Sequence, residues 1–312
     1  MSRADHAIDL SPARIAAAVE RIDPAFLSTP QFVSDDLSKA VGRELVIKNE
    51  TVTPIGSFKG RGTWLLADEL NPNKTWVCST AGNFGQGLAY AARDRGATVE
   101  AFVSPDVPEA KATSMRALGA RVHEAAQPGQ AARQHVAASA ARLLVLDGLR
   151  PEMAEGAGTI AVELEAAGPV DLAVVQVGDG ALISGVACWL KHASPQTRVV
   201  GVCASGAPAM ARSFAAGHVV STPGTDTIAT AIAISEPIGE SLARVLALVD
   251  EIVLVDDEHL RSAQRLILDT LGIAVEPAGA AGVAALARHR ERLPSGRTAV
   301  LLTGAGAPER HE

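Results

Sequence analysis

The chain has 312 residues, of which 47% are apolar and 20% are charged, a composition typical of a globular protein. Its 35 acidic and 28 basic side chains give a formal net charge of −7, which argues against nucleic acid or an anionic membrane as a partner. The longest segment without charged residues, 75–92, contains Asn83, Gln86 and three glycines, so we expect no membrane-spanning helix. The first ten residues carry charges of both signs and no apolar core, which favours a cytoplasmic protein over an exported one.

Cysteine and histidine give no sign of a metal site. The three cysteines, Cys78, Cys188 and Cys203, lie in apolar runs without a CxxC pair, which predicts small buried side chains in a reducing compartment. The eight histidines are scattered singly, without an HExxH motif or a Cys/His cluster. We therefore expect no disulfide and no bound metal ion.

Short β-rich runs alternate with longer alanine-rich runs along most of the chain, which predicts an α/β fold with parallel sheets wrapped by helices. A helix over 12–22 opens the chain. We expect strands over 44–48, 75–78, 98–103, 121–123, 171–177, 198–203, 251–255 and 298–302. We expect helices over 58–70, 83–95, 108–118, 130–142, 182–192 and 280–292, within 152–167, and near residues 207, 237 and 258.

No low-complexity linker divides the chain, so domain boundaries would fall in ordinary loops near residues 72 and 148. This predicts a small domain over 73–148 and a large domain made of 1–72 and 149–312. In α/β proteins, anions and ligands bind where strands end in glycine-rich loops that open helices. Four such segments carry chemistry here.

The first segment, 49–62, follows a strand and places Lys59 in the first turn of a helix. The helix dipole disfavours a cation there, which hints at a functional use. An ammonium that local positive potential deprotonates easily suits a Schiff-base nucleophile or a proton-transfer base. The same pattern also fits a solvated lysine at a helix start, and the phosphate loop GxxxxGK followed by Ser or Thr is not matched.

The second segment, 79–87, combines hydroxyls, an amide and three glycines between a strand and a helix. Backbone N–H groups at a helix N-terminus make a cradle for a carboxylate. A helix capped by Thr80 or Asn83 is the structural alternative. Capping needs one such residue, whereas several are gathered here, so we favour binding.

The third and fourth segments also end strands. Segment 177–185, VGDGALISG, lacks the glycine spacing of a dinucleotide site and the acidic residue that would bind a ribose. A single phosphate fits it better, and a tight turn that needs glycine is the structural alternative. In segment 301–306, Thr303 places a hydroxyl at the carboxyl edge of the sheet.

In this order and spacing, the segments resemble the fold type II pyridoxal-phosphate enzymes, the tryptophan synthase β-like superfamily. The resemblance covers about 30–306 and is strongest with the threonine and serine dehydratase branch. It depends on the lysine motif SFKGRG at 57–62 and the loop STAGN at 79–83 together. Two further segments, EGAGTIAVE at 155–163 and EPAGA at 276–280, also match that branch. The resemblance implies two open, twisted, mostly parallel sheets, with the cofactor between a large and a small domain.

The resemblance also implies roles for individual residues. Lys59 would form the Schiff base with pyridoxal 5′-phosphate, Phe58 would pack against its ring, and Asn83 would hydrogen-bond its 3-oxygen. Thr303 would face the pyridine nitrogen. The phosphate would be held by Gly178, Asp179, Gly180, Ala181 and Leu182. The carboxylate of a small amino-acid substrate would be bound by Ser79, Thr80, Ala81, Gly82 and Asn83.

A hydroxyl at Thr303 does not protonate the pyridine nitrogen, which favours elimination over transamination. Lys59 would take the Cα proton, and the β-substituent would leave. The resemblance therefore implies a lyase, a dehydratase or ammonia-lyase that converts a β-hydroxy or β-substituted amino acid such as serine or threonine to a 2-oxo acid and ammonia. Family habit implies a homodimer.

The chain also departs from the family pattern. Ala81 stands where serine racemases carry a second catalytic serine, which disfavours racemisation. Asp179 and Ala181 replace glycines of the phosphate loop, and an acid beside a phosphate repels it unless the side chain turns outward. Thr230 and Ala231 replace Asp and Gly of the dehydratases, which suggests a changed substrate preference. No carboxylate stands in 201–204, where relatives hold a cation.

Two other functions fit the same residues. One is β-replacement of the cysteine synthase type, in which a second nucleophile adds after the β-substituent leaves. The other is a non-catalytic protein that keeps the fold and binds the cofactor or a partner, which the altered phosphate loop supports and intact Lys59, Asn83 and Thr303 oppose. Which amino acid and which stereoisomer react is not encoded in these motifs.

Overall fold

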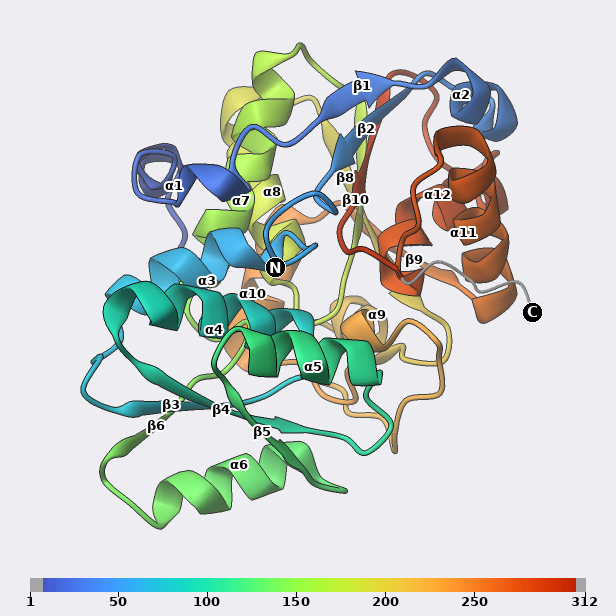
Figure 1. Cartoon of the computed structure of the whole chain (residues 1–312). Helices are drawn as coiled ribbons and strands as arrows, with labels where there is room; N and C mark the ends of the chain where they lie inside the picture. Colours follow the sequence, from blue (N-terminus) through green and yellow to red (C-terminus); the bar gives the residue numbers. More distant parts are fainter. Residues whose placement is uncertain (1–7, 307–312) are drawn as a thin grey trace.

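The computed structural model describes residues 8–306, which form two sheets with helices on both faces of each (Figure 1). The larger sheet has six strands in the order β1-β2-β10-β7-β8-β9. Their bounds are β1 Gln31–Val33, β2 Leu45–Asn49, β7 Leu172–Gln176, β8 Arg198–Ala204, β9 Glu251–Val255 and β10 Thr298–Leu302. Neighbouring strands are parallel except β1 and β2, which pair antiparallel.

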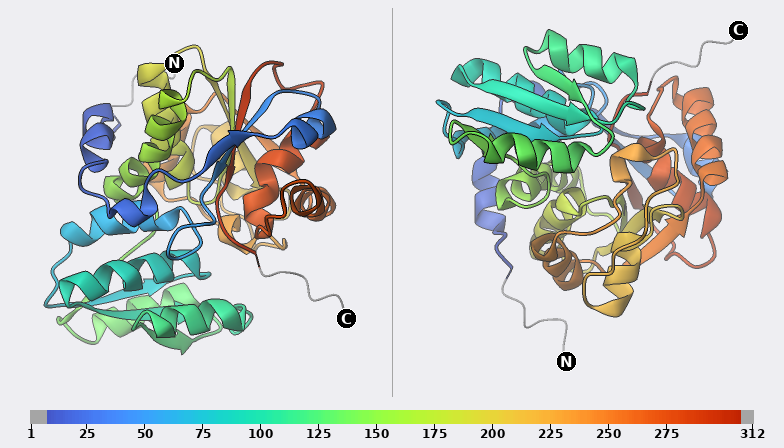
Figure 2. Two further views of the ribbon diagram at one scale, coloured as in Figure 1. Left: turned by 45° about the horizontal axis from the view of Figure 1, so that its top comes forward. Right: turned by 90° about the horizontal axis from the view of Figure 1, so that it is seen from below.

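The smaller sheet has four strands in the order β5-β4-β3-β6, all parallel. Their bounds are β3 Thr75–Ser79, β4 Thr98–Val103, β5 Arg121–Glu124 and β6 Arg142–Leu144. Figure 2 shows this part of the chain, coloured from blue-green to green, as a unit beside the rest of the molecule.

Helices cover both sheets in layers. Their bounds are α1 Pro12–Ala18, α2 Asp35–Val41, α3 Lys59–Asp68, α4 Asn83–Arg95, α5 Glu109–Ala117, α6 Pro128–Ala137, α7 Pro151–Ala166, α8 Ala181–Ala193, α9 Ala209–Ala216, α10 Gly239–Leu248, α11 Asp257–Leu271 and α12 Ala281–Arg288. Three short 3-10 turns are η1 Pro24–Phe26, η2 Thr230–Ile232 and η3 Pro277–Ala280. In Figure 1, α4 and α5 lie on one face of the smaller sheet and α6 on the other.

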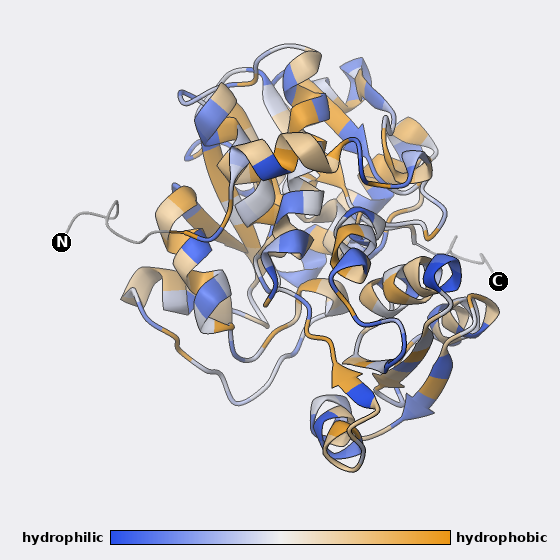
Figure 3. Ribbon diagram, turned by 90° about the vertical axis from the view of Figure 1, so that its left-hand side faces the viewer, coloured by the Kyte–Doolittle hydropathy of each residue, from blue (hydrophilic) through white to orange (hydrophobic). Residues whose placement is uncertain are grey.

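Alternating side chains of the larger sheet fill two separate cores. On β7, Leu172 and Val174 pack with α11 and α12, whereas Ala173 and Val175 pack with α7, α8 and α10. All four side chains are buried because helices cover both faces, as parallel sheets require. Hydrophobic residues accordingly gather in the strands of the larger unit, while the helices alternate hydrophobic and hydrophilic residues (Figure 3).

The predicted α/β class with two mostly parallel sheets is confirmed. Strands β1 and β6 and helix α2 were not predicted from the sequence. The predicted helix over 130–142 was wrong at its end, because α6 stops at Ala137 and Arg142 opens β6. Within residues 8–306, no helix is long and apolar enough to span a bilayer. The three cysteines are free and buried, as predicted.

Each sheet reverses its strand order at one point. In the larger sheet the chain runs outward through β7, β8 and β9 and then returns to place β10 on the other side of β7. In the smaller sheet it runs outward through β3, β4 and β5 and returns to place β6 beside β3. Loops diverge at such switch points, which leaves a crevice at the carboxyl ends of the strands.

Candidate active site

A cleft of about 880 Å³ opens at these two switch points. The smaller sheet contributes Ser79 at the end of β3 and Asp147 after β6, and the larger sheet contributes Gly178 after β7 and Thr303 after β10. Lys59, at the start of α3, also lines the cleft. Of the thirteen residues predicted for the site, all but Ala181 line this cleft, and Ala181 is fully buried at the start of α8.

Lys59 lies between two carboxylates. Its Nζ is 2.5 Å from Oδ2 of Asp147 and 3.5 Å from Oδ2 of Asp179. It also lies 5.2 Å from the centroid of the Phe58 ring. We call Asp147 and Asp179 the acid pair. The loops that carry them lie side by side as well, because a Cβ on Gly148 would lie 3.0 Å from Cβ of Asp179.

The acid pair changes the protonation of Lys59. Burial disfavours the Lys59 ammonium, but the two carboxylates outweigh this and raise its pKa. The expectation that local positive potential would deprotonate Lys59 was therefore wrong, because the lysine has acidic neighbours. Burial and the nearby Asp179 carboxylate raise the pKa of Asp147 to about 7. Burial also disfavours the Asp179 carboxylate, but Lys59 and the Ala181 N–H outweigh it and lower the Asp179 pKa.

The loop after β7 makes a tight turn before α8. Gly180 has a φ of 98°, and a Cβ there would lie 2.9 Å from Oγ of Ser241. A Cβ on Gly178 would lie 3.0 Å from Cα of Ile232. Asp179 turns inward rather than outward, with its Oδ1 accepting a hydrogen bond of 2.9 Å from the Ala181 N–H. A phosphate placed at this turn would be repelled by the Asp179 carboxylate.

The loop before α4 both caps the helix and lines the cleft, the two alternatives considered from the sequence. The Thr80 hydroxyl accepts hydrogen bonds from the N–H groups of Gly82 and Gly85, so it satisfies the start of the helix. Gly82 has a φ of 135°, and the Lys111 side chain lies against its Cα. Asn83 and Phe84, in the first turn of α4, line the cleft with the loop, and their N–H groups have no acceptor within the helix.

Glu276, at the start of η3, joins the two sides of the cleft. It accepts a hydrogen bond of 2.8 Å from Nδ2 of Asn83 and forms an ion pair of 2.7 Å with Nζ of Lys111. Lys111 belongs to α5, on the smaller sheet. Glu276 was part of a motif in the sequence but had no assigned role there, and Lys111 was not singled out.

Thr303 is oriented by Gln176. The Gln176 Nε2 donates to the Thr303 hydroxyl oxygen at 2.7 Å and to two backbone carbonyls. Because the hydroxyl oxygen accepts this bond, its hydrogen can be donated to another group in the cleft. Gln176 was missed because a polar residue at the end of a buried strand has no motif around it.

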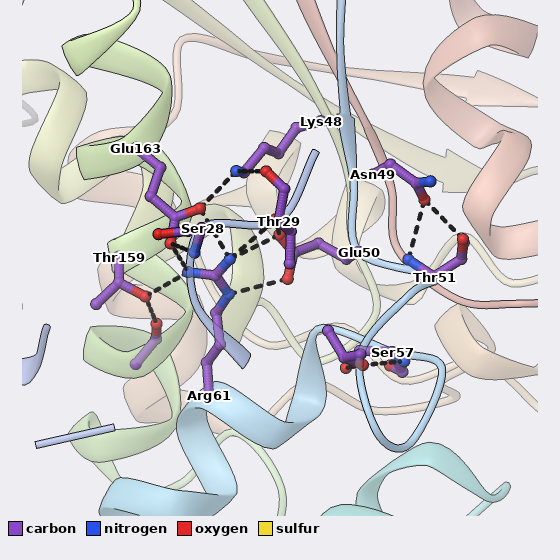
Figure 4. A network of polar contacts seen from close by, with 12 residues as sticks. Ser28, Thr29, Lys48, Asn49, Glu50, Thr51, Ser57, Arg61, Thr159 and Glu163 are labelled. Carbon is purple, nitrogen blue, oxygen red and sulfur yellow. Dashed lines mark hydrogen bonds and ion pairs between the residues drawn. The ribbon is translucent and has the colours of Figure 1, made fainter. Parts of the chain in front are cut away.

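Arg61 lies two residues after Lys59 but faces away from the cleft into a network of its own (Figure 4). Its guanidinium donates to both carboxylate oxygens of Glu50, at 2.9 and 2.8 Å, and at 2.6 Å to Glu163. Lys48 donates to Glu163 at 2.5 Å. We call these residues, with Thr29 and Thr159, the Arg61 network. It joins the SFKGRG segment to the 155–163 segment on α7.

The most consequential residue missed from the sequence is Asp147. It follows β6, which was not predicted because a helix was expected up to residue 142. The signal was present, since the apolar run Leu143–Leu146 ends in Asp-Gly, a typical strand-to-turn pattern. Arg133, from α6, also lines the cleft and was not predicted.

A lysine, an amide, a hydroxyl and a glycine turn at facing sheet edges define a cofactor-dependent α/β enzyme site. The sequence matches the family described as pyridoxal-phosphate dependent enzyme over residues 22–304. The chain belongs to this family, whose cofactor is pyridoxal phosphate, and the resemblance to the threonine and serine dehydratase branch is confirmed.

Three relatives illustrate the similarity. Phenylserine dehydratase of Ralstonia pickettii is 33% identical over 300 residues, 93% of this chain and 91% of that protein. Serine racemase of Oryza sativa subsp. japonica is 30% identical over 288 residues, 90% of this chain and 84% of that protein. The crystal structure of T.th. threonine deaminase has a TM-score of 0.87 and 31% identity, covering 95% of this chain and 98% of that one.

The residues of the cleft fit this cofactor. Lys59 supplies an amine, and Thr303 supplies a neutral hydroxyl whose hydrogen is free for a ring nitrogen. Gly178 and Gly180 keep the loop before α8 close to its neighbours, where added Cβ atoms would collide. The acid pair is the unusual feature, because it brings two carboxyl groups to the same region.

Proposed function

We propose that this protein catalyses β-elimination from a small β-hydroxy or otherwise β-substituted amino acid, and releases a 2-oxo acid and ammonia. The observation that carries the proposal is that Lys59 and the neutral Thr303 hydroxyl line one cleft. Pyridoxal phosphate, when bound, supplies an electron sink for the electrons left at Cα. A neutral group at the pyridine nitrogen limits that sink, which favours elimination over transamination.

The protein's residues would act on the amino acid in a defined geometry. The loop 79–82 and the first N–H groups of α4 bind its carboxylate, with the Lys111 ammonium adding a positive charge beside Gly82. Glu276 fixes both Lys111 and Asn83 in place. Lys59 as free amine takes the proton from Cα, and as an ammonium it can pass that proton to the β-hydroxyl, which leaves as water. Hydrolysis of the unsaturated product then gives the 2-oxo acid and ammonia. Ala81 offers no group to return a proton to the opposite face, which supports elimination over racemisation.

Residues near η2 supply the substrate side of the cleft. Thr225, Thr227, Thr230 and Ala231 line it. The hydroxyl of Thr230 and the methyl of Ala231 stand where an acid and a glycine would occur in dehydratases, so we propose a substrate preference that differs from threonine. We also propose the small domain over 73–148, whose strands β3 to β6 form one sheet, and a homodimer in the cytoplasm.

The test is a visible absorption spectrum of the protein with pyridoxal phosphate, before and after L-serine, L-threonine, L-threo-3-hydroxyaspartate or L-threo-phenylserine is added. We expect a Schiff-base band that borohydride abolishes, and 2-oxo acid formation with at least one amino acid. Lys59→Ala should lack both, whereas Lys39→Ala, on the exposed face of α2, should keep both. A band without any product would favour the non-catalytic protein.

A second assay separates elimination from β-replacement. Sulfide or another nucleophile is added with the amino acid, and the products are identified. Unchanged 2-oxo acid and ammonia would support the lyase. A new β-substituted amino acid formed at the expense of 2-oxo acid would support the cysteine synthase type instead.

A further inference from the structure

The acid pair occupies the region proposed to hold the cofactor phosphate. Asp179 belongs to the loop 178–182, and its Oδ1 already accepts the Ala181 N–H at the start of α8. That N–H is one of the donors that a phosphate at this helix terminus would use. The carboxylate therefore stands where one phosphate oxygen would accept, with the Lys59 ammonium 3.5 Å away.

Helix α10 holds both loops that carry the acid pair. The Ser241 hydroxyl donates to the backbone carbonyl of Asp179. Arg244, which is 1% exposed, donates at 2.9 Å to the carbonyls of Gly148 and Leu149, directly after Asp147. Asp9 pairs with the same guanidinium at 2.7 Å. These bonds keep the backbones of both acids in place, so a simple swing of either loop does not remove the carboxylates.

Charge balance then limits what the site can hold. The two aspartates face one lysine, and a bound phosphate would add a charge of about −1.5 to −2. Three anionic groups around one cation in a partly buried cleft favour protonation of one of them, because like charges a few ångströms apart disfavour the charged form. Oδ1 of Asp147 is buried and has no hydrogen-bond partner among the described residues. A proton on Asp147 would remove one charge and provide a donor for a phosphate oxygen.

We propose that binding of the phosphorylated cofactor is coupled to uptake of a proton by the acid pair, so that the protein binds its cofactor more weakly as the pH rises. This inference rests on the assignment of the phosphate to 178–182. The protonation state of Asp147 and Asp179 thus sets the affinity for the phosphate group.

The groups around the pair support protonation near neutral pH. Burial and the charge of Asp179 raise the pKa of Asp147 to about 7, and a phosphate would raise it further. Lys59 faces the pair from α3, and in the protein without its cofactor the raised pKa keeps it an ammonium. Cys78 faces Asp147 from β3, and burial raises its thiol pKa to about 12, so it stays neutral. Arg244, from α10, faces the loop that follows Asp147.

The test compares two ligands that lack an aldehyde and so cannot react with Lys59. The Kd values of pyridoxine 5′-phosphate and pyridoxine are measured between pH 7 and 9, above the second phosphate pKa of about 6. The ratio of the two Kd values cancels the ring ionisations that both ligands share. We expect the preference for the phosphorylated ligand to fall about tenfold for each pH unit, the slope of one proton. Titration calorimetry in two buffers of different ionisation enthalpy should register about one proton taken up.

Two isosteric variants test the residues. Asp147→Asn and Asp179→Asn should bind pyridoxine 5′-phosphate about tenfold or more tightly than wild type at pH 9, with a shallower pH dependence. Asn at position 179 can still accept the Ala181 N–H, so the start of α8 is kept. Asp106→Asn, at an exposed position that also lines the cleft, is the matched control and should keep the wild-type slope. Circular dichroism verifies folding.

Different failures have different meanings. Equal slopes in wild type and both Asn variants, or no proton uptake, would overturn the coupling while leaving the phosphate site intact. Equal affinities for the two ligands at every pH would overturn the inference at its base, because the phosphate would then not be held by 178–182. Neither result would alter the separate proposal of β-elimination, which depends on product assays.

Discussion

Lys59 and Arg61 stand two residues apart at the start of α3, yet they enter two clusters of opposite character. In the Arg61 network, one buried guanidinium meets two glutamates, and a second cation, Lys48, meets the second of them. At Lys59, one ammonium meets two aspartates, and Oδ1 of Asp147 lacks a partner among the described residues. Completed pairing stabilises a fold, whereas incomplete pairing leaves groups that can bind a ligand or a proton.

The largest expected effect is on the Lys59 side. Lys59→Ala should lower the rate of 2-oxo acid formation by about 10³-fold or more, because both the Schiff-base amine and the proton acceptor are lost. Its folding should change little, since Asp147 can take a proton once the ammonium is gone. Product assay and chemical denaturation on the same preparation measure the two effects. A variant that retains near-wild-type turnover would exclude Lys59 from the chemistry.

The opposite result is expected for Arg61. Arg61→Leu should lower the free energy of unfolding by about 3–5 kcal/mol, because Glu50 and Glu163 would be left as buried, uncompensated carboxylates. Urea denaturation measures this loss. The double variant Arg61→Leu with Glu50→Gln should recover part of it, since one of the stranded charges is then removed. A loss below about 1 kcal/mol in the single variant would mean that the network is not closed as described.

The acid pair should also make stability depend on pH. A carboxyl whose folded pKa is raised contributes stability below its ordinary pKa, and that contribution is lost as the pH rises through the folded value. For Asp147 the window extends from about pH 4 to about pH 7, and the loss is on the order of 4 kcal/mol. The lowered pKa of Asp179 acts below this window. Asp147→Asn should flatten the stability profile between pH 4 and 7, and an unchanged profile would contradict the assignment.

The Lys59 side was largely predictable, and its gaps have a physical cause. Lys59, Asn83, the glycine loop and Thr303 were predicted because each belongs to a short motif at a strand end. Asp147 was missed because β6 has only three residues and follows directly on a helical pattern. Gln176 and Lys111 have no local signature, since their partners, Thr303 and Glu276, are more than a hundred residues away in the chain.

The Arg61 side shows a related limit. The motifs at 57–62 and 155–163 were both recognised, but nothing in the sequence linked Arg61 to Glu163 or to Lys48. Such a link appears only when α3 and α7 pack together, because the energetic effect of a buried charge depends on its neighbours in space. Periodicity predicts which strands are buried, as on β2, but it cannot predict that Lys48 is buried with them.

The smallest expected effect is at Thr80. Its variants test whether its hydroxyl stabilises the fold or takes part in the chemistry of the cleft. Its hydroxyl accepts two backbone hydrogen bonds that start α4, so Thr80→Val should cost about 1 kcal/mol of stability and Thr80→Ser should restore it. Since the same loop is proposed to bind the substrate carboxylate, the variant should also raise KM, while kcat stays near that of wild type. Thermal unfolding and steady-state kinetics measure the two. A loss of kcat without a loss of stability would place the hydroxyl in the chemistry rather than in the helix cap.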